Sequence, residues 1–287
     1  MVTVESISSS RNDLAALLAG TSNAPYPLDM VIREKLDRPG VDGAAEVLGA
    51  IEEGRLVGAV VRCGRFVRLI GVASSARRRG LGRTLMAAVE SRAAASGETN
   101  VVIAAEPGNY FTPGVWTEDA GSLAFFDSLG YSRPARAVNL RADLGFLETQ
   151  GPDAGTGSRI RRPNIGERVR VANYIREEFG RSWCFEADFA FEHPLPSMFI
   201  AEEGSEIVGF SAHLANNAGL PWYGPTGVSS AARGRGFGRG LLLASLRDMK
   251  VRGFGEAIIA WAAALDFYKR ACGASPAARF VILEKNL

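Results

Sequence analysis

The feature of this sequence that most constrains its fold is an internal repeat. Residues 69–88 align without a gap to residues 225–244, and eleven of the twenty positions are identical. The offset of 156 residues is close to the usual length of one domain, so the repeat indicates a duplicated domain and not a solenoid of short units. A chain of 287 residues can bury a separate apolar core in each of two such domains. Each half is therefore expected to carry the same kind of site.

A segment rich in Gly, Pro, Asp, Ser and Thr separates the two copies. Residues 145–158 cannot build a periodic apolar face, and they are therefore predicted to be a linker. This placement gives an N-terminal domain at residues 1–144 and a C-terminal domain at residues 159–287.

The order of predicted elements indicates the fold class. In the first half, residues 46–51, 56–61 and 66–72 are apolar runs separated by turn residues, which predicts an antiparallel meander. Helical spacing starts at Leu81, and from there strands and helices alternate, with the same order in the second half. The sequence thus predicts an α/β fold in each half, with a mixed sheet covered by helices on both faces.

Composition and charge narrow the functions that need considering. The 33 basic and 31 acidic residues nearly cancel, and a net charge of +2 gives no general attraction to nucleic acid or membranes. The longest nearly apolar run, residues 257–265, is about half of the roughly 20 residues that a bilayer-spanning helix needs. Three scattered cysteines and two histidines disfavour disulfide frameworks and zinc sites. We expect a cytoplasmic protein without a metal, a nucleic-acid partner or a membrane partner.

The repeated segment itself has the pattern of an anion-binding loop. In both copies a strand ends at Gly-Val, a short Ser/Ala turn follows, and Arg-x-x-Gly-x-Gly opens an amphipathic helix. Glycines allow close approach of a ligand, and the first amides of a helix lack intrahelical partners. The helix dipole and the arginines add positive charge, so a pyrophosphate fits each loop. A P-loop needs a lysine, and the dinucleotide motif needs a third glycine where Leu85 and Leu241 stand, which disfavours both.

The pattern Val-x4-Arg-x-x-Gly-x-Gly, at residues 72–82 and 228–238, resembles the acyl-CoA loop of the GNAT superfamily of N-acyltransferases. Each half also has a later strand followed by a helix that ends near a Phe-x-x-x-Gly motif, most clearly at residues 126–130. The resemblance covers nearly the whole chain outside the linker. It implies two tandem GNAT-like domains and acetyl-CoA as the acyl donor. We expect an amine of a small molecule as the acceptor, with peptide and protein amines as alternatives, and the oligomeric state is left open.

The resemblance also implies which residues hold the donor. The loop amides are expected to bind the CoA pyrophosphate, and the pantetheine arm is expected to run between two diverging parallel strands. In the first half the implied residues are Val72, Arg77, Arg78, Arg79, Gly80, Leu81, Gly82, Arg83 and Thr84, together with Asn109 from a later loop. In the second half they are Val228, Arg233, Gly234, Arg235, Gly236, Phe237, Gly238 and Arg239.

The two halves differ at the position that the resemblance assigns to the catalytic acid. In the family's mechanism the acceptor amine attacks the thioester directly, a backbone N–H stabilises the oxyanion, and a tyrosine protonates the thiolate. That tyrosine usually stands four residues before the glycine of the last helix, where the first half has Phe126. In the second half Tyr268 stands five residues before Gly273 and is the candidate acid. A buried core tyrosine is the alternative.

Other residues are candidates for the chemistry in the first half. Glu106, at the end of a strand, is a candidate acceptor for the amine proton, and Tyr110 is a candidate for the leaving group. The structural alternative is a Pro/Gly-rich turn packed by its aromatic residues. His193 and His213 are weaker candidates for a base. Because Phe126 has no proton to donate, a second hypothesis makes one half a non-catalytic module that binds acyl-CoA for structure or sensing.

Overall fold

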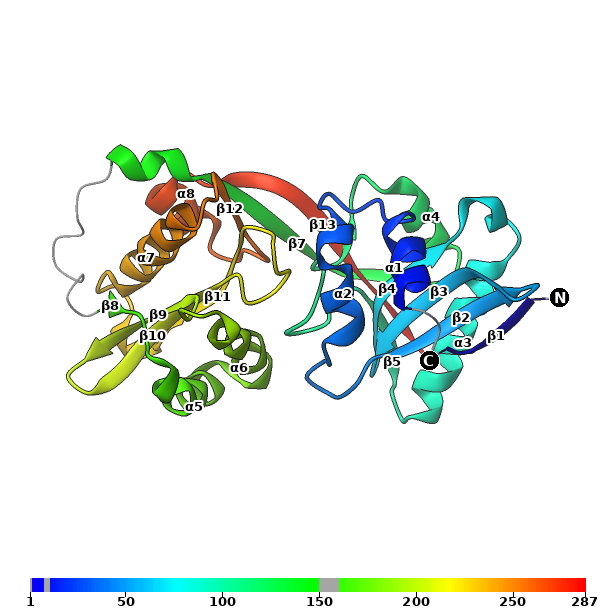
Figure 1. Ribbon diagram of the computed structural model, residues 1–287, viewed down its shortest axis with the longest axis horizontal. Helices are drawn as coiled ribbons and strands as arrows, with labels where there is room; N and C mark the ends of the chain where they lie inside the picture. Colours follow the sequence, from blue (N-terminus) through cyan, green and yellow to red (C-terminus); the bar gives the residue numbers. More distant parts are fainter. Residues whose placement is uncertain (1, 8–10, 150–159) are drawn as a thin grey trace. The chain divides into compact units, whose positions relative to one another are not determined.

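The computed structural model describes residues 2–7, 11–149 and 160–287, and the chain divides into two compact units (Figure 1). Unit 1 comprises Met1–Ala137 and Ala278–Leu287, and unit 2 comprises Val138–Ala277. The predicted linker at residues 145–158 starts within a 3-10 helix, Leu144–Thr149, and its remaining residues lie outside the described part of the chain.

The sheet of unit 1 begins with the antiparallel meander that the sequence predicts. Its strands in spatial order are β1 (Val2–Ser6), β2 (Glu46–Glu52), β3 (Arg55–Cys63), β4 (Phe66–Val72), β5 (Asn100–Ile103) and part of β13 (Ser275–Asn286), and β6 (Val115–Trp116) pairs with β13. The helices are α1 (Arg11–Ala19), α2 (Leu28–Asp37), α3 (Leu81–Ala95) and α4 (Ala120–Asp127). β4 and β5 are parallel because α3 carries the chain back across the sheet between them.

Helices cover both faces of the sheet in unit 1. A Cβ placed on Gly71 of β4 would lie 3.3 Å from Leu18 of α1, and one placed on Gly58 of β3 would lie 3.2 Å from Leu85 of α3. On the α3 face, buried side chains from the strands and from α3 join Phe126 of α4 in one core cluster. The predicted α/β class with covered faces is therefore confirmed for this unit.

Unit 2 repeats this arrangement. Its strands are the second part of β7 (Ser132–Asp143), followed in spatial order by β12 (Glu256–Ile259), β11 (Trp222–Val228), β10 (Glu206–His213), β9 (Met198–Glu203) and β8 (Ile160–Arg161). Its helices are α5 (Arg168–Phe179), α6 (Arg181–Asp188), α7 (Phe237–Val251) and α8 (Leu265–Cys272). Gly227 of β11 faces Phe179 of α5, whereas Gly209 of β10 faces Leu241 of α7, so the helices again cover both faces.

Two strands carry the chain between the units. The chain leaves unit 1 inside β7 and returns to it inside β13. Residues 283–286 of β13 pair with β5 of unit 1, whereas residues 140–143 of β7 pair with β12 of unit 2. The compact units thus differ from two consecutive segments of chain, because residues 278–287 complete unit 1. This exchange could not be predicted, because the sequence pattern of a strand shows which of its faces is buried but does not show which strand lies beside it.

Candidate functional site

A pair of parallel strands separates in the same way in each unit. In unit 1 the last bond between β4 and β5 runs from Ala104 N to Val67 O (2.8 Å). In unit 2 the last bond between β11 and β12 runs from Ala260 N to Tyr223 O (3.3 Å), at the same offset of 156 residues. These four strands lie wholly within the described residues, and beyond these bonds β4 and β11 have no ladder with their parallel neighbours. Backbone groups along the gap are therefore available to a ligand.

A β-bulge stands at the start of each gap. In unit 1 the pairing of β3 with β4 shifts by one residue, which leaves Arg68 as the extra residue of β4. In unit 2 the pairing of β10 with β11 shifts at the equivalent place, where Gly224 and Pro225 oppose Ala212 alone. Bulges next to functional sites bend a strand and redirect its side chains.

The loop after each gap has the same backbone conformation in both units. A 3-10 turn follows the strand, Ser74–Ala76 in unit 1 and Ser230–Ala232 in unit 2. The next helix then begins after a left-handed glycine, Gly80 with φ +84° and Gly236 with φ +87°. Since side chains are strained in this conformation, the motif requires glycine at these two positions. The first amides of α3 and α7 follow directly, and amides at a helix start lack intrahelical partners and are suited to an anion.

The first arginine of each loop is held by the strand before it. Arg77 Nε donates a hydrogen bond to Val72 O (3.0 Å), and Arg233 Nε donates one to Val228 O (3.3 Å). The loop therefore folds back onto the end of its own strand in both units.

The arginine directly before the left-handed glycine of each loop is paired with a glutamate of the preceding hairpin. Arg79 Nη1 donates to Glu52 Oε2 (3.0 Å) and Arg235 Nη1 to Glu203 Oε2 (2.7 Å), with a second, shorter contact between the same side chains in each pair. The hydrogen bond from Arg79 is the main cause that lowers the pKa of Glu52. Both arginines were predicted to bind the donor, but the structure gives them carboxylate partners that anchor the loop.

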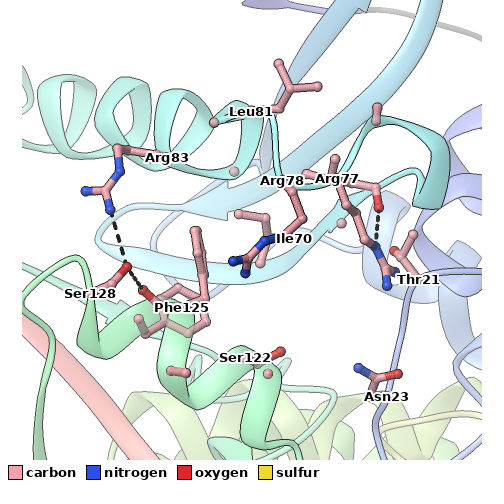
Figure 2. Close-up of a pocket in the computed structure, with 18 residues that line it drawn as sticks. Thr21, Asn23, Ile70, Arg77, Arg78, Leu81, Arg83, Ser122, Phe125 and Ser128 are labelled. Carbon is pink, nitrogen blue, oxygen red and sulfur yellow. Dashed lines mark hydrogen bonds between the residues drawn. The ribbon is translucent and has the colours of Figure 1, made fainter.

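The residue between these two arginines differs between the units. Arg78 adopts the left-handed conformation (φ +62°) and has no acidic partner among the described residues, whereas the equivalent residue in unit 2 is Gly234 (φ +75°). Figure 2 shows the Arg78 guanidinium between the loop and Phe125. The loop of unit 1 therefore has a cation available to an anionic ligand at a position where the loop of unit 2 has no charged side chain.

A cavity of about 710 Å³ lies over the loop of unit 1 (Figure 2). Its walls come from the end of β4, the loop, the first turn of α3, one face of α4, and Thr21 and Asn23 between α1 and α2. Of the predicted donor-binding residues, those that line it are Val72, Arg77, Arg78, Gly80, Leu81, Gly82 and Arg83. Arg79, Thr84 and Asn109 do not line it. Sequence reasoning did not assign Thr21, Asn23 or the α4 wall to the donor site. The Phe-x-x-x-Gly motif marks the end of α4, but no motif marks Thr21 or Asn23.

A phenylalanine stands above the second glycine of each loop. A Cβ on Gly82 would lie 3.1 Å from the ring of Phe125 on α4, and a Cβ on Gly238 would lie 3.7 Å from the ring of Phe267 on α8. Because both phenylalanines make the same contact, α4 and α8 occupy equivalent positions in the two units. The residues that follow them, Phe126 and Tyr268, are then equivalent as well.

That alignment places Tyr268 where unit 1 has Phe126. Each ring lies 5.0 Å from the phenylalanine before it, and both are buried, with 2% of Phe126 and 8% of Tyr268 exposed. The spacing of five residues to Gly273 arises because α8 continues for a turn past Tyr268, whereas α4 ends at Asp127. Burial raises the pKa of Tyr268 to about 12, so its hydroxyl is protonated at neutral pH.

The structure places Glu106 and Asn109 in a buried polar network of unit 1. Arg68 donates two hydrogen bonds to the carboxylate of Glu106 (2.5 and 2.7 Å), and it also donates to Lys35 O and Arg38 O at the end of α2 (2.7 and 2.9 Å). Lys35 Nζ donates to Asn109 Oδ1 (3.0 Å), and burial lowers the pKa of Lys35 to about 8. Glu106 thus uses both oxygens to hold Arg68, and neither Glu106 nor Asn109 is brought into the cavity.

The remaining candidates also lie away from the cavity or have structural partners. Tyr110 is 7% exposed and does not line the cavity. His213 is buried against Asp248, with Nε2 at 2.7 Å from Oδ2, and burial lowers its pKa. His193 Nε2 lies 3.1 Å from Leu214 O.

Residues 2–7, 11–149 and 160–287 contain neither a candidate metal-binding group nor a candidate membrane-spanning helix. Among these residues no group of three or more His, Cys, Asp or Glu side chains is arranged to hold a metal ion. None of the helices that they form combines the length and the apolar character needed to cross a membrane.

Sequence comparison identifies the family. A model described as an acetyltransferase (GNAT) domain matches residues 24–110, and one described as the acetyltransferase (GNAT) family matches residues 168–274. Together the two matches cover more than half of the chain. No curated protein sequence matched it.

Solved structures with both units are similar in fold. The glucosamine N-acetyltransferase region of a fungal multi-domain GH3 β-N-acetylglucosaminidase matches with a TM-score of 0.80 at 18% identity over 99% of this chain, which spans 38% of that longer chain. A tandem GNAT protein from the clavulanic acid biosynthesis pathway matches with a TM-score of 0.71 at 18% identity, covering 100% of this chain and 98% of its own. A GCN5-related N-acetyltransferase from Sphaerobacter thermophilus gives 0.68 at 19% identity, with 99% and 95% covered. With a GNAT match in each half, the chain belongs to the GNAT acetyltransferase family as a tandem of two such domains.

Proposed function

We propose that the protein transfers an acetyl group from acetyl-CoA to an amine of a small molecule, by direct attack of the amine. The observation that carries this proposal is the duplicated loop, with its left-handed glycine and open helix end next to a gap between parallel strands. In unit 1 the loop and Arg78 face a cavity of about 710 Å³, within the size range of cofactor sites. Backbone amides at a helix start with an arginine beside them fit a pyrophosphate.

The proposed reaction needs no nucleophilic side chain. The amine forms a bond to the thioester carbonyl carbon, the carbon–sulfur bond breaks, and the sulfur takes a proton. Tyr268 is the proposed donor of that proton in unit 2, because burial keeps its hydroxyl protonated. The proton lost by the amine passes to solvent, which also reprotonates Tyr268.

A second candidate function concerns unit 1 alone: it binds acyl-CoA without turning it over. Phe126 occupies the position of Tyr268 and has no proton to give. The bulge residue Arg68 is fully buried and bonded to Glu106, so a long side chain extends from the bulge of unit 1. Unit 2 has Gly224 at that place. These differences favour chemistry in unit 2.

A turnover assay with acetyl-CoA and a panel of amines tests the proposed function. We expect thiol release that depends on at least one small-molecule amine, and calorimetry is expected to show CoA binding to the full chain. CoA binding without turnover on any amine would support only the binding-module function, and a chain that binds no CoA would contradict both functions.

Replacing Gly238 with valine is expected to weaken CoA binding in unit 2 by tenfold or more, because the side chain keeps the phosphates away from the helix amides. The nearest protein atom to the new Cβ would be at 3.7 Å, an ordinary contact, so the fold is expected to survive. Gly82→Val is the matched change in unit 1, where the Phe125 ring must also move. Calorimetry measures both, and unchanged affinity in folded Gly238→Val protein would contradict the loop assignment.

Arg78→Gly, which gives unit 1 the residue found in unit 2, is expected to weaken CoA binding in unit 1 up to about tenfold. The reason is loss of a partly exposed cation next to phosphates. Its effect should fade between about 0.1 M and about 1 M salt, where the Debye length falls from about 10 Å to about 3 Å. Titrations at several salt concentrations measure this, and an equal salt dependence in wild type and variant would show that Arg78 does not face the ligand.

A further inference from the structure

The bulges and last helices of the two units differ in chemistry at equivalent positions. At the offset of 156 residues, Val67 of unit 1 corresponds to Tyr223 of unit 2, and Arg68 corresponds to Gly224. On the last helices, Phe126 corresponds to Tyr268 through the contacts over the loop glycines. Unit 2 therefore has two hydroxyls where unit 1 has apolar side chains, and no side chain where unit 1 has a buried arginine.

Space is available at the bulge of unit 2. A Cβ placed on Gly224 would meet no atom within 4 Å. In unit 1 the Arg68 side chain at this place is 0% exposed and extends to the end of α2 and to Glu106. The side-chain position at the bulge is therefore occupied in unit 1 and open in unit 2.

The Tyr223 hydroxyl is buried and unsatisfied. Tyr223 is 1% exposed, and its hydroxyl has no hydrogen-bond partner among the described residues. The Thr226 hydroxyl donates to Phe210 O (3.0 Å) and lies near enough to Tyr223 to act on its pKa, but the geometry gives no hydrogen bond between the two hydroxyls. Burial raises the pKa of Tyr223 well above its ordinary value, so the group is a hydrogen-bond donor at any working pH. Folded proteins seldom leave such a group without a partner, and a ligand is one way in which the partner is supplied.

Tyr223 and Tyr268 belong to the same side of unit 2. Their ring centroids are 6.4 Å apart with an interplanar angle of 79°, and both join the core cluster that includes residues of α7. Tyr223 is also the last β11 residue that pairs with β12, so it stands where the gap opens.

The distance from the loop to Tyr223 matches the reach of a pantetheine arm. Five residues of strand from Val228 back to Tyr223 span about 16 Å at roughly 3.3 Å per residue. An extended arm of about 13 bonds from phosphorus to sulfur, at roughly 1.2 Å of advance per bond, is also about 16 Å long. A thioester would thus lie near Tyr223 when the pyrophosphate is at the α7 loop.

We propose that Tyr223 is a second functional hydroxyl of unit 2, which donates a hydrogen bond to the thioester atoms that gain negative charge when the amine attacks. The inference rests on the proposed function. Tyr223 keeps its proton, and Tyr268 remains the residue that protonates the sulfur. A donor held in place in a dry site is worth more in the reaction than in water.

Tyr223→Phe in the full chain tests this role. The expected results are a Tm without ligand that is unchanged or higher, since an unsatisfied hydroxyl is removed, and a kcat about 10-fold to 100-fold lower. Affinity for acetyl-CoA is expected to fall while affinity for CoA itself stays the same, because only acetyl-CoA has a thioester. The binding comparison needs no acceptor, so it distinguishes failure of this inference from failure of the proposed amine chemistry.

Tyr131→Phe in unit 1 is the matched control. The Tyr131 hydroxyl donates to Glu90 (3.1 Å), so its loss is expected to lower Tm and leave kcat unchanged, which is the reverse of the expected result for Tyr223→Phe. An unchanged kcat in Tyr223→Phe would overturn the inference. A loss of kcat that accompanies a lower Tm and equal weakening of CoA and acetyl-CoA would assign Tyr223 a structural role and overturn it as well.

Discussion

Tyr268→Phe is expected to lower kcat by about 10²-fold to 10⁴-fold, the usual effect of losing a general acid, with affinity for CoA nearly unchanged. The phenylalanine ring keeps the packing against Phe267 and Tyr223, so only the proton is lost. Steady-state thiol release measures the effect, and calorimetry with CoA separates binding from chemistry.

Tyr110→Phe is the competing variant for the same assay. Because Tyr110 does not line the cavity of unit 1, this change is expected to leave kcat as in wild type. If Tyr110→Phe loses activity while Tyr268→Phe retains it, the chemistry belongs to unit 1 and Tyr268 is not the acid.

The pH profile adds an independent test of Tyr268. A tyrosine acts as an acid only while protonated, so its contribution is lost as pH rises through its pKa. Burial raises that pKa to about 12, and kcat is therefore expected to show no alkaline decline between pH 7 and about pH 10. A decline centred near pH 10, the ordinary tyrosine value, would contradict the assignment.

Glu106→Gln is expected to destabilise unit 1 by about 3–5 kcal/mol. The side chains of Arg68 and Glu106 are 0% and 3% exposed, and the glutamine would leave a buried guanidinium without its countercharge. Arg68 also bonds the carbonyls at the end of α2, so the helix is expected to loosen with it. Denaturant unfolding measures the change in the free energy of unfolding.

Glu52→Gln is the matched change at an exposed Arg–Glu pair. Arg79 and Glu52 are 49% and 25% exposed, so solvent compensates for the lost ion pair and the expected loss of stability is small compared with that of Glu106→Gln. Equal small effects at Glu106 and Glu52 would show that the buried network does not stabilise unit 1.

The family and the loop geometry could be predicted from sequence because both depend on local rules. A left-handed position before a helix admits little besides glycine. The presence of glycine at positions 80 and 236 therefore indicates this backbone conformation. The repeat then showed that the geometry occurs twice. The tandem GNAT prediction is confirmed by the two family matches.

The roles of the charged residues could not be predicted because they depend on contacts between distant segments. Arg79 and Glu52 are 27 residues apart, and Arg235 and Glu203 are 32 apart, so their pairing follows from strand register and not from the motif. Glu106 was expected to face the reacting groups, but a bulge turns Arg68 toward it and the two side chains neutralise each other. Register shifts of this kind leave no pattern in a single sequence.

The return of β13 to unit 1 sets the order in which the units can fold during synthesis. Residues 278–287 supply the strand beside β5, and the ribosome makes them only after the whole of unit 2. At about 5–20 residues per second, roughly 8–30 s pass between the emergence of residue 137 and that of residue 287. During that time β5 presents an unpaired edge to other nascent chains. The N-terminal unit, most of whose residues are made first, therefore cannot complete its sheet until the whole C-terminal unit has been synthesised.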